Sequence, residues 1–166
     1  MIRVIAKKKV VFSLTDILKA LSKIRAYLLS SELAREICVE HGKDESLLIG
    51  IPIDISDDID VSAKTEDGRI FLNAALLDGE FEILMRYVIH ELVHVMQHMD
   101  GGAKDKGDDY LNRDSELDAF KYQIEFDSEN RSREDVMEYV EGLLDFHDIP
   151  EGKRGDKEEE LMEQVD

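Results

Sequence analysis

The chain has 166 residues, enough for one domain with a hydrophobic core. Its 21 basic and 39 acidic residues give a formal net charge of -18. Such a charge repels nucleic acid phosphates and anionic membranes, so we expect neither as a partner. Cys38 is the only cysteine, so no disulfide can form within the chain, and no apolar run approaches the ~20 residues of a membrane span. We therefore expect a cytoplasmic protein with one domain, residues 1–149, and an acidic tail, residues 150–166.

The amino-terminal part of the chain predicts strands on either side of one long helix. Short apolar runs at residues 2–5 and 10–12 are typical of strands. Thr15 then predicts a helix N-cap, and apolar residues at helical spacing continue to Gly42, where we expect the helix to end. Residues 47–55 are rich in branched side chains and predict another strand.

The middle of the chain predicts a turn, a strand and an apolar helix. Asp67 and Gly68 are a turn signal, and residues 69–73 after them are expected to be a strand. A helical pattern then covers residues 80–99 and ends before Gly101. That helix is apolar nearly all round, so we expect it to be buried.

Two more helices and a tail are expected beyond a polar loop. The helices cover residues 114–126 and 132–146, and Ser132 with Asp135 approximates a capping box. Residues 150–166 are charged and broken by glycine, which predicts a flexible tail or at most a fraying helix. The expected fold class is α+β, with a small twisted amino-terminal sheet packed on the apolar helix.

The apolar helix contains two histidines four residues apart, in the pattern His90-Glu91-Leu92-Val93-His94. This spacing places both imidazoles one turn apart on one ridge, where they can reach a single ion. Glu91 points about 100° away and can hold a water bound to that ion. The alternative is an ordinary buried helix whose histidines are satisfied by hydrogen bonds.

A catalytic zinc usually takes three protein ligands and leaves its fourth position to water, so a third donor is expected downstream. Glu116 is the best candidate, because it lies near the start of the next helix among apolar neighbours. Its alternative role is a glutamate favoured by the helix dipole. His98 repeats the four-residue spacing, but a straight helix cannot aim three residues along ~12 Å at one ion, so a place at the rim is expected. 

The longer metzincin pattern, which has glycine three residues after the second histidine and a third histidine three residues later, is excluded. Gln97 and Asp100 occupy those two positions.

These residues resemble the gluzincins, and among them the ImmA/IrrE-type family of zinc metallopeptidases. The resemblance covers about residues 69–126 and rests on the strand Ile70-Phe71-Leu72-Asn73, the motif of residues 90–94, and Glu116-Leu117-Asp118-Ala119, which is similar to that family's Glu-x-x-Ala element. Val93 departs from it, since the family commonly has glycine there.

The resemblance implies a small zincin-like fold, with His90, His94 and Glu116 as ligands of Zn²⁺ and Glu91 as the catalytic base. Zinc lowers the pKa of its bound water to about 7, Glu91 accepts the proton, and the hydroxide attacks a peptide carbonyl. Tyr110, in the loop before the Glu116 helix, is a candidate donor to the oxyanion, although packing on the helix is the alternative.

The expected function is therefore zinc-dependent cleavage of a protein or peptide substrate. Two alternatives stay open. The net charge of -18 favours an acidic interaction or inhibitor protein, and a zincin fold can bind its metal without cleaving anything.

Overall fold

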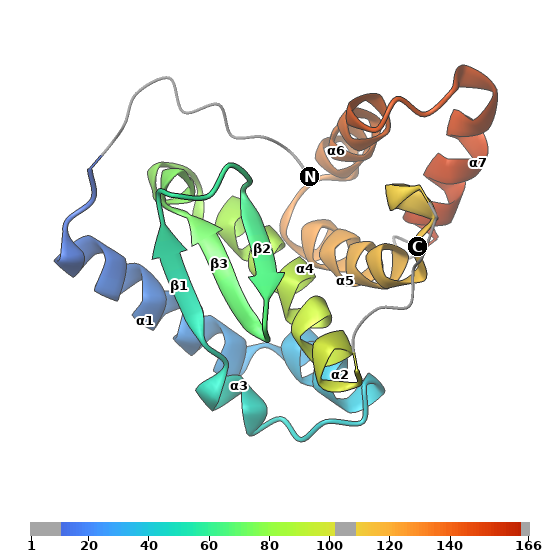
Figure 1. Ribbon diagram of the computed structural model, residues 1–166. Helices are drawn as coiled ribbons and strands as arrows, with labels where there is room; N and C mark the ends of the chain where they lie inside the picture. Colours follow the sequence, from blue (N-terminus) through green and yellow to red (C-terminus); the bar gives the residue numbers. More distant parts are fainter. Residues whose placement is uncertain (1–10, 102–108, 164–166) are drawn as a thin grey trace.

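The computed structural model describes residues 11–101 and 109–163, which form one small sheet and a larger set of helices packed against it (Figure 1). The elements in chain order are α1 Leu14–Ser30, α2 Glu32–Glu40, α3 Leu47–Gly50, β1 Ile53–Ser56, β2 Ala63–Glu66, β3 Arg69–Asn73, the 3-10 helix η1 Ala74–Asp78, α4 Phe81–Met99, the 3-10 helix η2 Tyr110–Asn112, α5 Asp114–Asn130, α6 Arg133–Phe146 and α7 Glu151–Met162. The expected α+β class is confirmed.

The sheet has the strand order β1-β3-β2 and is mixed. β1 runs parallel to β3, and β2 pairs antiparallel with β3. The predicted turn at Asp67 and Gly68 joins β2 to β3, and both residues have positive φ, 50° and 74°. A two-residue hairpin needs this left-handed conformation, which aspartate tolerates and glycine adopts freely. On the central strand, Ile70 and Leu72 alternate into the core.

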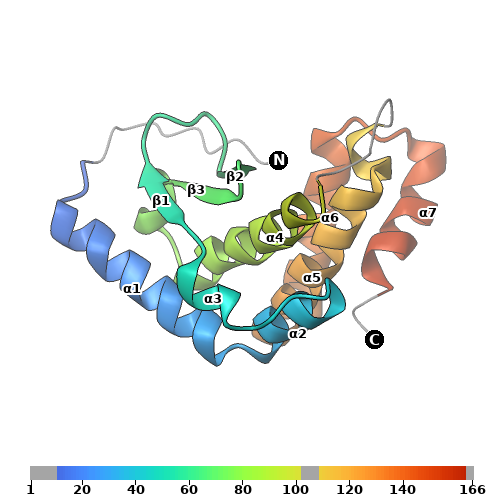
Figure 2. The same ribbon diagram turned by 60° about the horizontal axis from the view of Figure 1, so that its bottom comes forward.

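Helices α1 and α4 lie on one face of the sheet, as Figure 2 shows. Their apolar residues form one core with the sheet and α2, among them Ile24, Leu28, Leu72 and Val88. As its composition predicts, α4 is buried on most of its circumference: Leu84, Val88 and Leu92 are buried, and so are Ile89 and Val93 on an adjoining side.

Helix α5 lies between two apolar cores and contributes residues to both. Ala119, Tyr122 and Phe126 belong to the core around the sheet. Phe120 and Ile124 belong to a second core, built with α6, α7 and η2. Glu116, in the first turn of α5, therefore lies where the two cores adjoin.

The expected helix from Thr15 to Gly42 is two helices. Ser13, not Thr15, caps α1, in a capping box with Asp16. Ser31 interrupts the helix and caps α2, accepting a hydrogen bond from the backbone N–H of Ala34 at 3.1 Å. The apolar spacing continues across this break because both helices bury their residues in the same core.

The strand expected at residues 47–55 is in part a helix. Residues 47–50 form α3, and the strand β1 occupies residues 53–56. Arg25 stabilises α3 and the residue after it by donating hydrogen bonds to the carbonyl oxygens of Leu48 and Ile51. Of the strands expected at residues 2–5 and 10–12, residues 11 and 12 have no regular structure and the rest lie outside the described residues.

Of the two carboxyl-terminal helices, α6 forms as expected, and α7 is more regular than expected. α6 begins with the predicted capping box of Ser132 and Asp135. Residues 151–162, where a flexible tail or a fraying helix is expected, form α7. Leu161 and Met162, in its last turn, are buried in the second core. Among the described helices, none has the length and apolar character of a membrane span.

Candidate metal centre

Helix α4 places the two motif histidines next to each other, with His90 buried and His94 partly buried. Their ring centroids are 4.9 Å apart, as expected for residues one helical turn apart. Phe120 of α5 contacts His90 edge-on at 4.7 Å between ring centroids, so the ring is held from the side of the second core.

Glu116 completes a group of three ligand atoms from two helices. Its Oε2 lies 3.2 Å from Nε2 of His90 and 3.4 Å from Nε2 of His94. The two Nε2 atoms are 3.1 Å apart. The structure thus brings together the three residues that the sequence predicts as metal ligands, and it could hold a metal ion among them.

The size of this triangle fits zinc. Ligands at about 2.0–2.1 Å from a tetrahedral Zn²⁺ lie about 3.3–3.4 Å from one another, close to the three distances here. Two imidazole nitrogens and one carboxylate oxygen are also a donor set that zinc commonly takes. Nδ1 of His90 is buried without a hydrogen-bond partner among the described residues, so this ring is directed to the triangle through Nε2 alone.

The charges of the group favour a cation at its centre. Burial lowers the pKa of His94, but the hydrogen bond and charge of Glu116 outweigh burial and raise it to about 9. Burial raises the pKa of Glu116, but hydrogen bonds from His90 and His94 outweigh burial and hold it well below its ordinary value. Without a metal, the buried carboxylate of Glu116 therefore retains a proton on His94, where a bound cation would supply the same positive charge.

Glu91 is buried beside the first histidine and is held by the sheet. Thr65 of β2 places its Oγ1 2.8 Å from Oε2 of Glu91 and 3.1 Å from the carbonyl oxygen of Glu91. The charge of Glu91 also contributes to raising the pKa of both His94 and Tyr110, so its carboxylate lies within electrostatic reach of the site.

Tyr110, in η2, is directed at the same group. Burial, and after it the charge and a hydrogen bond of Glu116, raise the pKa of its hydroxyl far above the ordinary value. Its ring stacks on His147 with 4.6 Å between centroids. Burial lowers the pKa of His147 to about 4, which keeps this ring neutral at pH 7. The sequence contains no signal for His147, which follows the end of α6 and reaches the site only through the fold.

His98 lies outside the triangle, as expected. It sits against the hairpin turn of the sheet: a Cβ at Gly68 would be 3.3 Å from Cδ2 of His98.

Comparisons with protein-family models, with curated proteins and with solved structures find no match. The resemblance to the ImmA/IrrE-type family therefore rests on the residues of this chain alone.

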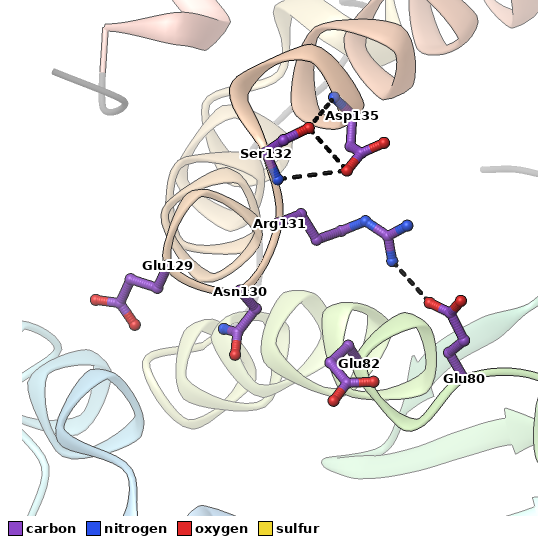
Figure 3. Close-up of a pocket in the computed structure, with 7 residues that line it drawn as sticks. All are labelled: Glu80, Glu82, Glu129, Asn130, Arg131, Ser132 and Asp135. Atoms are coloured by element: carbon purple, nitrogen blue, oxygen red, sulfur yellow. Dashed lines mark hydrogen bonds and ion pairs between the residues drawn. The ribbon is translucent and has the colours of Figure 1, made fainter.

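A separate polar hollow lies where α4 begins and α5 meets α6 (Figure 3). Arg131 reaches across it to Glu80 at 3.1 Å, and the capping box of Ser132 and Asp135 forms one wall. No predicted site residue lines this hollow. Its arginine and the capping carboxylate already have partners, so the metal centre is the stronger candidate for chemistry.

Proposed function

We propose that this chain is a zinc-dependent peptidase that hydrolyses peptide bonds of a protein or peptide substrate. His90, His94 and Glu116 would hold the metal, and Glu91 would act as the general base. The observation that carries the proposal is the triangle of three ligand atoms, whose sides of 3.1, 3.2 and 3.4 Å suit a tetrahedral zinc.

The metal, when bound, would lower the pKa of a water molecule to about 7 and polarise the substrate carbonyl. Glu91 would accept the proton of that water on its carboxylate and return it to the leaving amine. The hydrogen bond from Thr65 supports this role, because it keeps the carboxylate of Glu91 in one place. Burial of Glu91 excludes bulk water, which would otherwise compete for the proton.

Tyr110 would donate a hydrogen bond to the negative oxygen that develops on the attacked carbonyl. Its hydrogen bond with Glu116 supports this role, because it places the hydroxyl beside the three ligand atoms, and a tyrosine hydroxyl is a protonated donor at neutral pH. Stacking on His147 would hold the ring of Tyr110 in place.

The experiment compares metal content with cleavage of a fluorescently labelled unfolded protein. We expect one zinc per chain in the wild type, lost in His90→Ala and Glu116→Ala. Glu91→Gln is expected to keep zinc and to lose activity by roughly 10²–10⁴-fold, because it removes the proton acceptor. Glu82→Gln, an exposed glutamate on the same helix, is the matched control and should behave as the wild type.

Two outcomes would overturn the proposal. A wild type that holds zinc but cleaves nothing would favour a metal-binding module without turnover. A folded wild type that binds no metal would favour an acidic interaction protein, for which the net charge of -18 is the supporting observation.

A further inference from the structure

The outer nitrogen of His94 has a partner of its own on the same helix. Nδ1 of His94 lies 2.8 Å from Oε1 of Gln97. The amide nitrogen of Gln97 faces the other way, 3.0 Å from the carbonyl oxygen of Ser115 and 3.2 Å from Oδ2 of Asp118. Gln97 thus connects a predicted metal ligand on α4 with the first turns of α5.

These partners determine which way the amide points. Both groups near the amide nitrogen are acceptors, so the nitrogen of Gln97 must face them and its oxygen must face His94. A carbonyl oxygen accepts only, so Nδ1 of His94 carries the hydrogen in this contact. In the neutral ring the lone pair then lies on Nε2, the atom that faces His90 and Glu116.

The two histidines differ in this respect. Nδ1 of His90 is buried and has no hydrogen-bond partner among residues 11–101 and 109–163. On the side of the rings away from the triangle, Gln97 therefore holds a hydrogen on Nδ1 of His94, and no described residue does so for His90.

The same amide also positions the third ligand. Ser115, whose carbonyl accepts from Gln97, directly precedes Glu116. Asp118 accepts from Gln97 and is paired with Nε2 of His41 at 2.9 Å, and the other ring nitrogen of His41 donates to the carbonyl oxygen of Ile37 at 2.8 Å. The contact is therefore part of a chain of hydrogen bonds that ties the start of α5 to both α4 and α2.

We propose that Gln97 is a positioning residue of the metal centre, which presents the lone pair of His94 Nε2 and the carboxylate of Glu116 to one zinc-sized divalent cation. This inference rests on the proposed function for its metal only, and it requires no cleavage activity. It also gives a role to a residue that the sequence marks only as a departure from the metzincin pattern.

The first test is the affinity for zinc alone, measured by competition with a chromogenic chelator. Gln97→Leu keeps the size of the side chain but removes both the acceptor and the donor, and we expect roughly 10–100-fold weaker zinc binding. Gln123→Leu is the control, since it removes another buried glutamine of this protein, in the middle of α5. It should bind zinc as tightly as the wild type.

The second test needs no metal. Nitrogen-15 NMR of the metal-free wild type at a pH high enough for the ring of His94 to be neutral reports which ring nitrogen carries the hydrogen. We expect it on Nδ1 of His94, and a mixture of tautomers in Gln97→Leu. 

Wild-type His94 with its hydrogen on Nε2 would overturn the inference, as would equal zinc affinity in Gln97→Leu and the wild type. A wild type that binds zinc yet cleaves nothing would overturn the proposed peptidase and leave the role of Gln97 standing.

Discussion

The hydroxyl of Thr65 lies within hydrogen-bonding distance of two oxygens of one residue, Oε2 of Glu91 at 2.8 Å and the carbonyl oxygen of Glu91 at 3.1 Å. A hydroxyl has one hydrogen to donate and can also accept. While Glu91 is ionised, Thr65 can donate to its carboxylate. Once Glu91 has taken up a proton, Thr65 can accept from it and donate to the carbonyl oxygen instead. The strand β2 can therefore hold the proposed base in both protonation states.

Thr65→Val is expected to lower kcat for cleavage of the unfolded protein about 10-fold or more, because a hydrogen bond to a charged group contributes about 1.5–3 kcal/mol. Valine keeps the branched shape of threonine, so KM and zinc content should not change. Thr65→Ser keeps the hydroxyl and should recover most of the activity. The role of Thr65 is refuted if serine and valine reduce kcat equally, or if the loss of activity follows a loss of zinc.

The stability of the metal-free protein should depend on pH through His94 and Glu116. The pKa of His94 is raised from 6.5 to about 9, so its contribution is complete below pH 6.5 and is lost as pH rises through about 9. The pKa of Glu116 is lowered, so its contribution is present above the ordinary value of 4.5 and is lost as pH falls below that value. We expect the contribution of the pair to be greatest between these limits.

Urea unfolding of chelator-treated protein at a series of pH values measures this dependence. Glu116→Gln removes the charge that holds the proton on His94, so the decline in the free energy of unfolding between pH 6.5 and 9 should be smaller in this variant than in the wild type. Parallel curves for the two proteins would contradict the coupling. Added zinc should reverse the trend, because zinc competes with protons for the same nitrogen atoms.

Local patterns in the sequence were sufficient to predict α4 and the strand of residues 69–73. The apolar residues of α4 recur at helical spacing, and the turn residues Asp67 and Gly68 precede the strand. Strand β2 was missed because its sequence, Ala-Lys-Thr-Glu, has little apolar character and depends on pairing with β3. α7 was expected only as a flexible tail or a fraying helix for a similar reason, since Leu161 and Met162 find their partners only in the second core.

The sequence identifies more of the metal ligands than of the residues that surround them. The spacing of His90 and His94 is a local property of a helix, and Glu116 followed from the need for a third ligand. Gln97 could have been found as well, because three residues after His94 it lies on the same side of the helix. Thr65 could not, because only the packing of β2 on α4 brings it to Glu91.

A buried ion pair joins α4 to α5 away from the metal centre. Nε of Arg86 lies 2.8 Å from Oδ2 of Asp127, both side chains are nearly inaccessible, and the guanidinium also lies over the ring of Tyr139. Arg86→Met would leave the carboxylate buried without its partner, which is expected to cost about 3–5 kcal/mol of the free energy of unfolding. Burial raises the pKa of Asp127, so the loss should be smaller at acidic pH, where the carboxyl is protonated.

Chemical denaturation of Arg86→Met and of the double variant Arg86→Met with Asp127→Leu tests the origin of this loss. The double variant has no buried charge at this place and should recover much of the stability. A double variant as unstable as Arg86→Met would show that the loss arises from packing around Arg86, such as its contact with Tyr139, and not from the unpaired Asp127.

Helix α7 should stabilise the fold through its last turn. Leu161 is 4% exposed in the second core, and Lys157 donates a hydrogen bond to the carbonyl oxygen of Leu111 at 3.0 Å, next to Tyr110. Leu161→Ala is expected to lower the free energy of unfolding by about 2–5 kcal/mol, because it removes buried methyl groups and leaves a cavity. Glu159→Ala, at an exposed position of the same helix, should change it by no more than about 0.5 kcal/mol. Equal urea midpoints for the two variants would mean that α7 does not pack on the second core in solution, as a flexible tail would behave.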